Sequence, residues 1–276
     1  MQWEHMTATE FASAARETGV CVIAIGVIEK HSEHLPLGTD FLNGHEIACL
    51  AAEKEAAVVF PPFYFGQIYE ARCFPGTVTL KPTLLLELIQ GVLDEIGRNG
   101  FEKIIVYNAH GGNTSLLRFL AQCSLWEEKP YSVYYYAEPG MLTAEKEKEW
   151  ASILETSNHA HACECETSIS LANHPHLVKM DKLPPEPAEP LRRLEHLPSM
   201  FAGISWYANY PDHYAGDARP ASAEKGRLLR NLEVDSLAEF IAAVKTDQAV
   251  PDLNREFFAR VSAVREGAED VDEASI

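Results

Sequence analysis

The chain contains 276 residues, of which 46% are hydrophobic, and it carries a formal net charge of −18 at pH 7. A chain of this length can bury a large core and falls between one large α/β domain and two small ones. The acidic balance argues against a nucleic-acid partner, because no basic stripe is available to neutralise phosphates.

The lack of a recognisable targeting signal and the cysteine usage predict a cytoplasmic protein. The first ten residues are polar, unlike a secretory leader, and no apolar run approaches the roughly 20 residues of a membrane helix. We therefore expect no membrane partner. The six cysteines are scattered through apolar segments, which favours reduced thiols over a disulfide framework.

Helices and strands alternate in the predicted order of elements. Thr7 or Thr9 caps a first helix, and the apolar, β-branched run Val20–Ile25 is typical of a buried strand. The later helices are predicted over residues 41–57, 83–98, 114–126 and 221–245, with another near 169–172. The later strands are predicted over residues 58–60, 78–80, 103–107 and 131–136. This rhythm predicts a three-layer α/β/α fold with a mostly parallel central sheet.

Four groups able to bind a metal follow the first strand within twelve residues: Glu29, His31, His34 and Asp40. A two-residue step along an extended chain directs Glu29 and His31 to the same side. The alternative is a polar loop in which Asp40 only caps the next helix. For any one residue the polar loop is the better hypothesis, whereas for Glu29, His31 and Asp40 together after a buried strand it is a metal site.

Two further polar clusters stand at comparable positions. The segment Asn108–Asn113, with His110 at its centre, follows another predicted strand. Ligands of parallel sheets bind outside the carboxyl ends of the strands, so we expect His110 to converge on the first cluster. A third cluster contains His161, Glu164 and Glu166, although acids at a helix start are also favoured by the helix dipole alone.

Three segments carry a family resemblance: GVIEKHSEHLPLGTD from residue 26, NAHGGN from residue 108 and HACECETS from residue 161. In sequence and order they resemble the conserved segments of the creatininase (creatinine amidohydrolase) family, over roughly residues 1–245. The resemblance implies a single creatininase-like metallohydrolase domain across residues 1–276, with an acidic tail from about residue 265. It also implies a homo-oligomer, commonly a hexamer.

The same resemblance implies two divalent metal ions per chain, whether zinc, manganese or iron. Asp40 would bridge them, and His34 would support the site. The ligands in this chain that the resemblance implies are Glu29, His31, Asp40, His110 and Glu166. Creatininase itself has a glutamate two residues after the histidine that matches His110, where this chain has Gly112, so Glu166 is the candidate for the missing carboxylate. Asn108, Gly111, Gly112 and Asn113 are expected to shape the loop around His110.

The implied activity is metal-dependent hydrolysis of a small amide, such as a cyclic amide or a formamide. Two ions of this kind activate water and polarise a carbonyl group. His161 and Glu164 are the candidates for the proton donor to the leaving nitrogen, and the sequence does not choose between them. Peptide trimming and hydrolytic ring opening of a keto-inositol by the same site are the alternatives, and a non-catalytic metal-binding protein is the rival from another class.

Several departures from the family pattern indicate a shifted small-molecule substrate. Lys30, Ser32 and Glu33 replace the usual residues between the first ligands, and Ala71 stands near a common histidine position. Cys163 replaces a glycine.

Overall fold

The computed structural model describes residues 1–137 and 143–266. The helices are α1 (Ala8–Thr18), α2 (Thr39–Lys54), α3 (Pro82–Arg98), α4 (Thr114–Cys123), α5 (Ala144–Ile153), α6 (Glu164–Asn173), α7 (Ser205–Asn209), α8 (Ala223–Thr246) and α9 (Ala249–Glu266). The strands are β1 (Val20–Ile25), β2 (Val58–Val59), β3 (Lys103–Asn108), β4 (Ser132–Ala137), β5 (His159–His161) and β6 (Ala215–Gly216).

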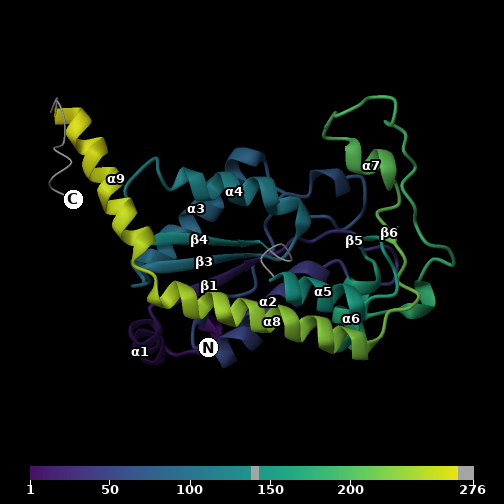
Figure 1. The fold of residues 1–276 in the computed structure, drawn as a ribbon, viewed down its shortest axis with the longest axis horizontal. Helices are drawn as coiled ribbons and strands as arrows, with labels where there is room; N and C mark the ends of the chain where they lie inside the picture. The colour runs from purple at the N-terminus through teal and green to yellow at the C-terminus, as the bar shows by residue number, and fades with distance from the viewer. Residues whose placement is uncertain (138–142, 267–276) are drawn as a thin grey trace.

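The central sheet has four strands in the order β2-β1-β3-β4, and every pair is parallel (Figure 1). Strands β1 and β3 pair along their whole length, from Val20 opposite Lys103 to Ile25 opposite Asn108. Their carboxyl ends therefore lie side by side. A second, antiparallel sheet contains only β5 and β6.

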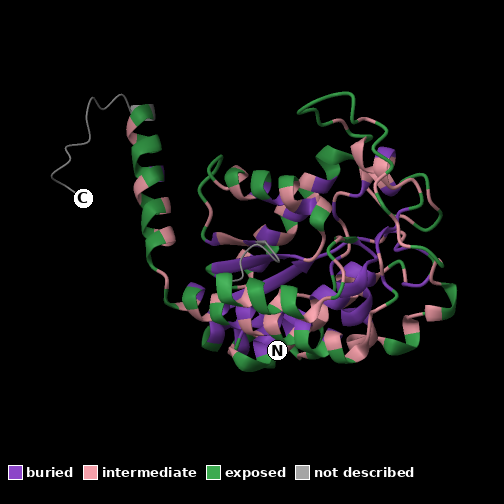
Figure 2. Cartoon of the chain, turned by 45° about the vertical axis from the view of Figure 1, so that its right-hand side comes forward, coloured by how far each residue is buried: buried purple, intermediate pink, exposed green. Residues whose placement is uncertain are grey.

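Helices cover both faces of the central sheet, which confirms the predicted three-layer fold. Along β1, Val20 and Val22 face the core formed with α2 and α8. The alternate residues Cys21 and Ile23 face the core formed with α1, α3 and α4. A strand buried on both faces needs apolar side chains at every position, which explains the unbroken run of hydrophobic residues. Figure 2 shows the sheet buried and the outer faces of the helices exposed.

The structure differs from the predicted elements in several places. Helices α5, α7 and α9 and strands β5 and β6 were not predicted. Residues 78–80 form no strand, because Val78 makes only a single bridge to Ile28. Pro251 looks like a helix breaker but stands in the first turn of α9, where proline is tolerated. Helix α9 projects from the body of the molecule (Figure 1). The acidic tail expected from about residue 265 lies almost entirely outside the described residues.

Candidate metal centre

The first polar cluster is held where β1 ends and α2 begins. Glu29 donates its backbone N–H to the carbonyl of Leu37 over 3.0 Å, which closes the loop between them. A side chain at Gly26 would collide with the start of α2, since a Cβ there would lie 2.4 Å from the backbone nitrogen of Phe41. The glycine after the strand therefore lets Asp40, in the first turn of α2, stand beside the segment that carries Glu29.

Asp40 lies between two histidines from different parts of the chain. Its Oδ1 is 2.9 Å from His31 Nε2, and its Oδ2 is 2.9 Å from His110 Nδ1. Glu29 Oε1 is 3.0 Å from the same His110 nitrogen. Three groups with mutually close ligand atoms result: Glu29/Asp40/His110, His31/Asp40/Glu166 and Glu29/His31/His161. Asp40 belongs to the first two.

The donor set fits divalent metal ions. Glu29 Oε1 and Asp40 Oδ2 are buried, and neither makes a hydrogen bond of regular geometry among the described residues. Both share the single nitrogen Nδ1 of His110, at 3.0 and 2.9 Å. A buried carboxylate oxygen with so little compensation is costly, and a cation bound there would remove that cost. Imidazole and carboxylate ligands suit zinc, manganese and iron. All five ligands that the resemblance implies therefore meet in one cluster.

The buried charges in this cluster shift one another's pKa. Burial alone would lower the pKa of His31, but the charges of Asp40 and Glu29 raise it to about 10. The same two carboxylates hold the pKa of His110 well above its usual value, against the effect of burial. Burial and the nearby Cys163 raise the pKa of Glu166 to about 8. Without a metal, the histidines therefore keep protons that a metal must displace.

Side chains of the loop after β3 fix His110. Asn108 Oδ1 accepts the His110 backbone N–H over 3.2 Å. Asn113 donates to the carbonyl of Ile25 over 3.0 Å and accepts the backbone N–H of Gln67 over 2.8 Å. A Cβ at Gly112 would lie 2.4 Å from His110 Nε2, so the histidine occupies the space that a carboxylate side chain would need. No contact requires glycine at Gly111.

His213 completes the site and was missed by the sequence reasoning. Its Nε2–H donates to Glu29 Oε2 over 2.6 Å, and its Nδ1 accepts the indole N–H of Trp206 over 3.1 Å. Because indole can only donate, this pair fixes the tautomer of His213 and leaves Glu29 Oε1 for a metal. The only sequence signal was a histidine in the loop-rich segment before residue 216.

His161 lies against the cluster, as predicted. Its ring centroid is 4.2 Å from that of His31 and 4.6 Å from that of His213. Its Nε2 lies 2.8 Å from the carbonyl of Lys30 and donates to it. Burial lowers the pKa of His161 to about 3, so the imidazole is neutral. Because Nε2 carries the hydrogen that is donated to Lys30, Nδ1 keeps a lone pair that can accept a proton.

Two predicted site residues point away from the cluster. The Glu164 carboxylate accepts hydrogen bonds from Lys225 and from the backbone of Glu155 and Thr156. Burial alone would raise the pKa of Glu164, but these donors lower it, so the group is an ionised partner of Lys225 and is unsuited to donate a proton. His34 Nε2 lies 2.9 Å from Thr167 Oγ1, which gives His34 the supporting position expected for it.

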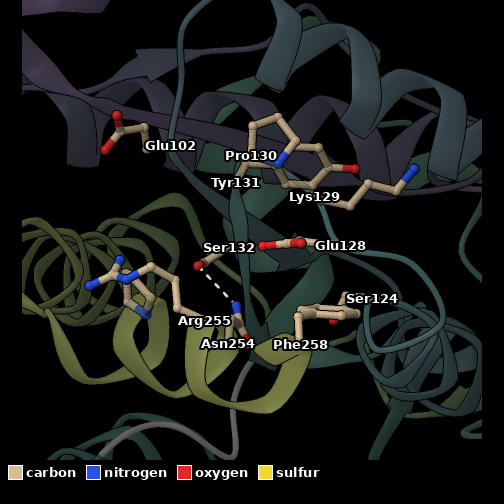
Figure 3. A pocket seen from close by; sticks show the side chains of 11 residues that line it. Glu102, Ser124, Glu128, Lys129, Pro130, Tyr131, Ser132, Asn254, Arg255 and Phe258 are labelled. Atoms are coloured by element: carbon tan, nitrogen blue, oxygen red, sulfur yellow. Dashed lines mark hydrogen bonds between the residues drawn. The ribbon is translucent and has the colours of Figure 1, made fainter. Parts of the chain in front are cut away.

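A cavity of about 230 Å³ reaches the cluster, and its lining includes Asp40, Gly111, Trp150, His159 and Glu166. A second cavity, of about 320 Å³, lies between α9 and the amino ends of β3 and β4 (Figure 3). There, Asn254 donates to Ser132 Oγ over 3.1 Å. This second cavity is at the opposite edge of the sheet from the cluster.

Comparison with known proteins identifies the family. The sequence model described as "Creatininase: Creatinine amidohydrolase" matches residues 4–241. The chain belongs to the creatininase family of hydrolases. Helix α9 lies beyond the matched residues.

Relatives within the family act on different substrates. The creatinine amidohydrolase of Pseudomonas putida is 24% identical over 80% of this chain and 88% of its own. The mycofactocin precursor peptide peptidase of Mycolicibacterium smegmatis is 30% identical, with 82% and 86% covered. The 3-dehydro-scyllo-inosose hydrolase of Thermotoga maritima is 26% identical, with 82% and 77% covered.

Solved structures share the fold. A mutant creatininase of Zn-Zn type superposes with a TM-score of 0.76 at 21% identity, covering 89% of this chain and 98% of that one. A creatininase described as a manganese form reaches 0.71 at 20% identity, covering 89% and 99%. Zinc and manganese forms both occur among the structural neighbours.

Metal binding should release protons. At about pH 9, above the pKa of Glu166 and below that of His31, loading with zinc should release a proton from His31, because only neutral imidazole binds a metal. His110, whose pKa is also raised, should add to the release. Since both histidine pKa values are raised, zinc affinity should climb as pH rises toward 10. A pH-stat titration in weak buffer measures the release, with His196→Gln as a surface control. Release of no proton would contradict the assignment.

Loss of His213 should weaken metal binding. His213→Asn keeps a residue type that tolerates the positive φ of 57° but removes the donor to Glu29. Metal affinity should fall about 10- to 100-fold, the usual effect of losing a group that orients a ligand. Competition with a chelator measures this, and His196→Asn on the surface should change nothing. Equal affinity in both variants would remove His213 from the site.

Proposed function

We propose that this chain is a metal-dependent amidohydrolase that uses two divalent ions to cleave a C–N bond in a small substrate. One observation supports this more than any other. The two oxygens of Asp40 face different histidines, so two ligand groups share one carboxylate. A carboxylate with one oxygen directed to each group is the arrangement that a bridging ligand needs.

Ions bound by these residues would polarise a carbonyl oxygen and lower the pKa of a water molecule. Side chains of this chain would orient the metal ligands and carry the proton. The hydrogen bond from His213 occupies Oε2 of Glu29, so Oε1 is the oxygen that remains to bind a metal. Burial of Glu29, His31 and Asp40 limits their contact with bulk water and strengthens their electrostatic interactions.

His161 is the proposed proton carrier. It is 5% exposed, neutral and anchored through Nε2–H to the carbonyl of Lys30. In the proposed role, the lone pair on its Nδ1 would take a proton and return it to the leaving nitrogen. Contact with the cluster, which His161 makes through the rings of His31 and His213, is the reason for this choice. Glu164, the other candidate, lacks contact with the cluster.

The size of the cavity favours a small substrate. Its volume of about 230 Å³ is below the roughly 300–1,000 Å³ of pockets that hold drug-sized ligands. A creatinine-like ring or a formamide suits this volume better than a long peptide. Ring opening of a keto-inositol is the second candidate, favoured by the similarity to the Thermotoga hydrolase.

A substrate panel tests the activity. Metal-loaded protein is offered creatinine, a formamide, a short peptide and a keto-inositol, and we expect turnover of an amide. Asp40→Asn should lose at least one ion and all turnover. The surface variant Asp181→Asn should keep the wild-type metal content and turnover. Two bound ions without turnover of any carbonyl substrate would favour a non-catalytic metal-binding protein.

His161→Ala separates proton transfer from metal binding. Turnover should fall about 10²- to 10⁴-fold, the usual contribution of a positioned acid or base, while the metal content stays the same. Metal analysis and steady-state kinetics on the same preparation provide both readouts. If the variant loses metal, His161 is a ligand, consistent with its position beside Glu29 and His31.

We also infer that the chain forms a homo-oligomer in the cytoplasm. Phe119, Leu125 and Trp126 are 56%, 45% and 92% exposed beside an apolar groove between α3 and α4, as at surfaces that bind another chain. No disulfide links the cysteines, which supports a reducing compartment. None of the described helices combines the length and hydropathy of a membrane span.

Light scattering tests the assembly. The wild-type mass should be a multiple of the single-chain mass, and Trp126→Glu should shift it toward smaller species because a charge would be buried in the contact. A wild-type mass of one chain would contradict the proposal. An unchanged assembly in the variant would exclude the α3–α4 groove as the interface.

A further inference from the structure

Three metal-binding side chains meet at the start of α6, outside the cluster around Asp40. They are His159, Cys163 and Cys165, and one ligand atom of each lies within 4.8 Å of the other two. The two sulfur atoms are 3.2 Å apart. Cys163 stands where the family pattern has glycine, so the group is not part of the general family site.

The fold brings these residues together from two elements. His159 begins β5, Cys163 is the N-cap residue of α6, and Cys165 is in the first turn of that helix. Between them Ala162 has a φ of 51°, which turns the chain back on itself. The pairing of β5 is irregular between His159 and His161, and this irregularity lets the two histidines face different neighbours.

We propose that His159, Cys163 and Cys165 bind a zinc-like divalent ion at a site distinct from the carboxylate-rich cluster. Two cysteines and one histidine are a known ligand set for zinc, and thiolates select softer ions than carboxylates do. Two thiolates on one tetrahedral zinc ion lie roughly 3.8 Å apart, so the sulfurs need to separate by only about 0.6 Å.

The surroundings of the three side chains favour a metal over a disulfide. A disulfide would bring the sulfurs to about 2.05 Å and give His159 no role. Thr156 Oγ1 lies 3.4 Å from His159 Nδ1, which orients the ring and leaves Nε2 available as the ligand atom. His159 and Cys165 also line the cavity, so the fourth position of the ion would face it.

An ion at this site would connect β5 to α6. His161 follows His159 by two residues on β5, and Glu166 follows Cys165 directly on α6. Fixing these two elements against each other would fix the proposed proton carrier and the proposed carboxylate ligand. The ion would therefore have a structural role beside the cavity, and its binding does not depend on the proposed function.

Cobalt provides the test, because thiolate ligands give Co²⁺ a near-ultraviolet charge-transfer band that carboxylate and imidazole ligands do not. The full-length protein is titrated with Co²⁺ under reducing conditions. We expect the band in the wild type and in the control Cys73→Ser, whose thiol is exposed elsewhere. We expect its loss in Cys165→Ser, together with one metal ion fewer per chain.

Two further variants guard against misfolding and against confusion with the other cluster. His159 is exposed, so His159→Gln should fold normally. Its affinity for the cobalt ion that gives the band should fall about tenfold or more, because loss of even a residue that only orients a metal ligand has an effect of that size. Asp40→Asn should keep the band. A wild type without the band, a band that survives in Cys165→Ser, or an air-stable disulfide between Cys163 and Cys165 that resists reduction would overturn the proposal.

Discussion

The arrangement of this protein depends on the buried carboxylate of Asp40. Its two oxygens each lie 2.9 Å from a histidine nitrogen, one on the loop after β1 and the other on the loop after β3. A buried charge is tolerated only when partners surround it, so the loops and the start of α2 must meet within a few ångströms. The parallel pairing of β1 and β3, which sets Ile25 beside Asn108, makes this meeting possible.

The same constraint explains how the buried carboxylates of the cluster are stabilised without a metal. In the metal-free cluster, protonated histidines balance Glu29 and Asp40, as the raised pKa values of His31 and His110 show. A divalent ion that binds takes over the positive charge that the leaving protons supplied. The side chains that could bind a metal are therefore already close together without one, so binding would cost little chain entropy.

Local patterns predicted much of the fold and most of the cluster, because β1, β3 and the helices between them have clear periodicity and the ligands follow strand ends. The position of His213 was not predictable, since 184 residues separate it from Glu29 and no periodic pattern marks its loop. The direction of Glu164 was missed for a related reason: its partner Lys225 comes from α8, and sequence spacing cannot reveal that contact. Helix α9 was missed because few of its side chains are buried and because Pro251, near its start, looks like a helix breaker.

The segment Lys30–Glu33 departs most from the family pattern, and its contacts suggest how such changes act. The Lys30 side chain pairs with Glu33 over 2.8 Å and lies over the ring of Phe74, away from the metal ligands. Its backbone carbonyl, however, accepts the hydrogen bond that orients His161, and Ser32 donates its backbone N–H to the carbonyl of His213. Substitutions in this segment would therefore act through the backbone, by changing the positions of His161 and His213. The residue types of the candidate metal ligands would stay the same.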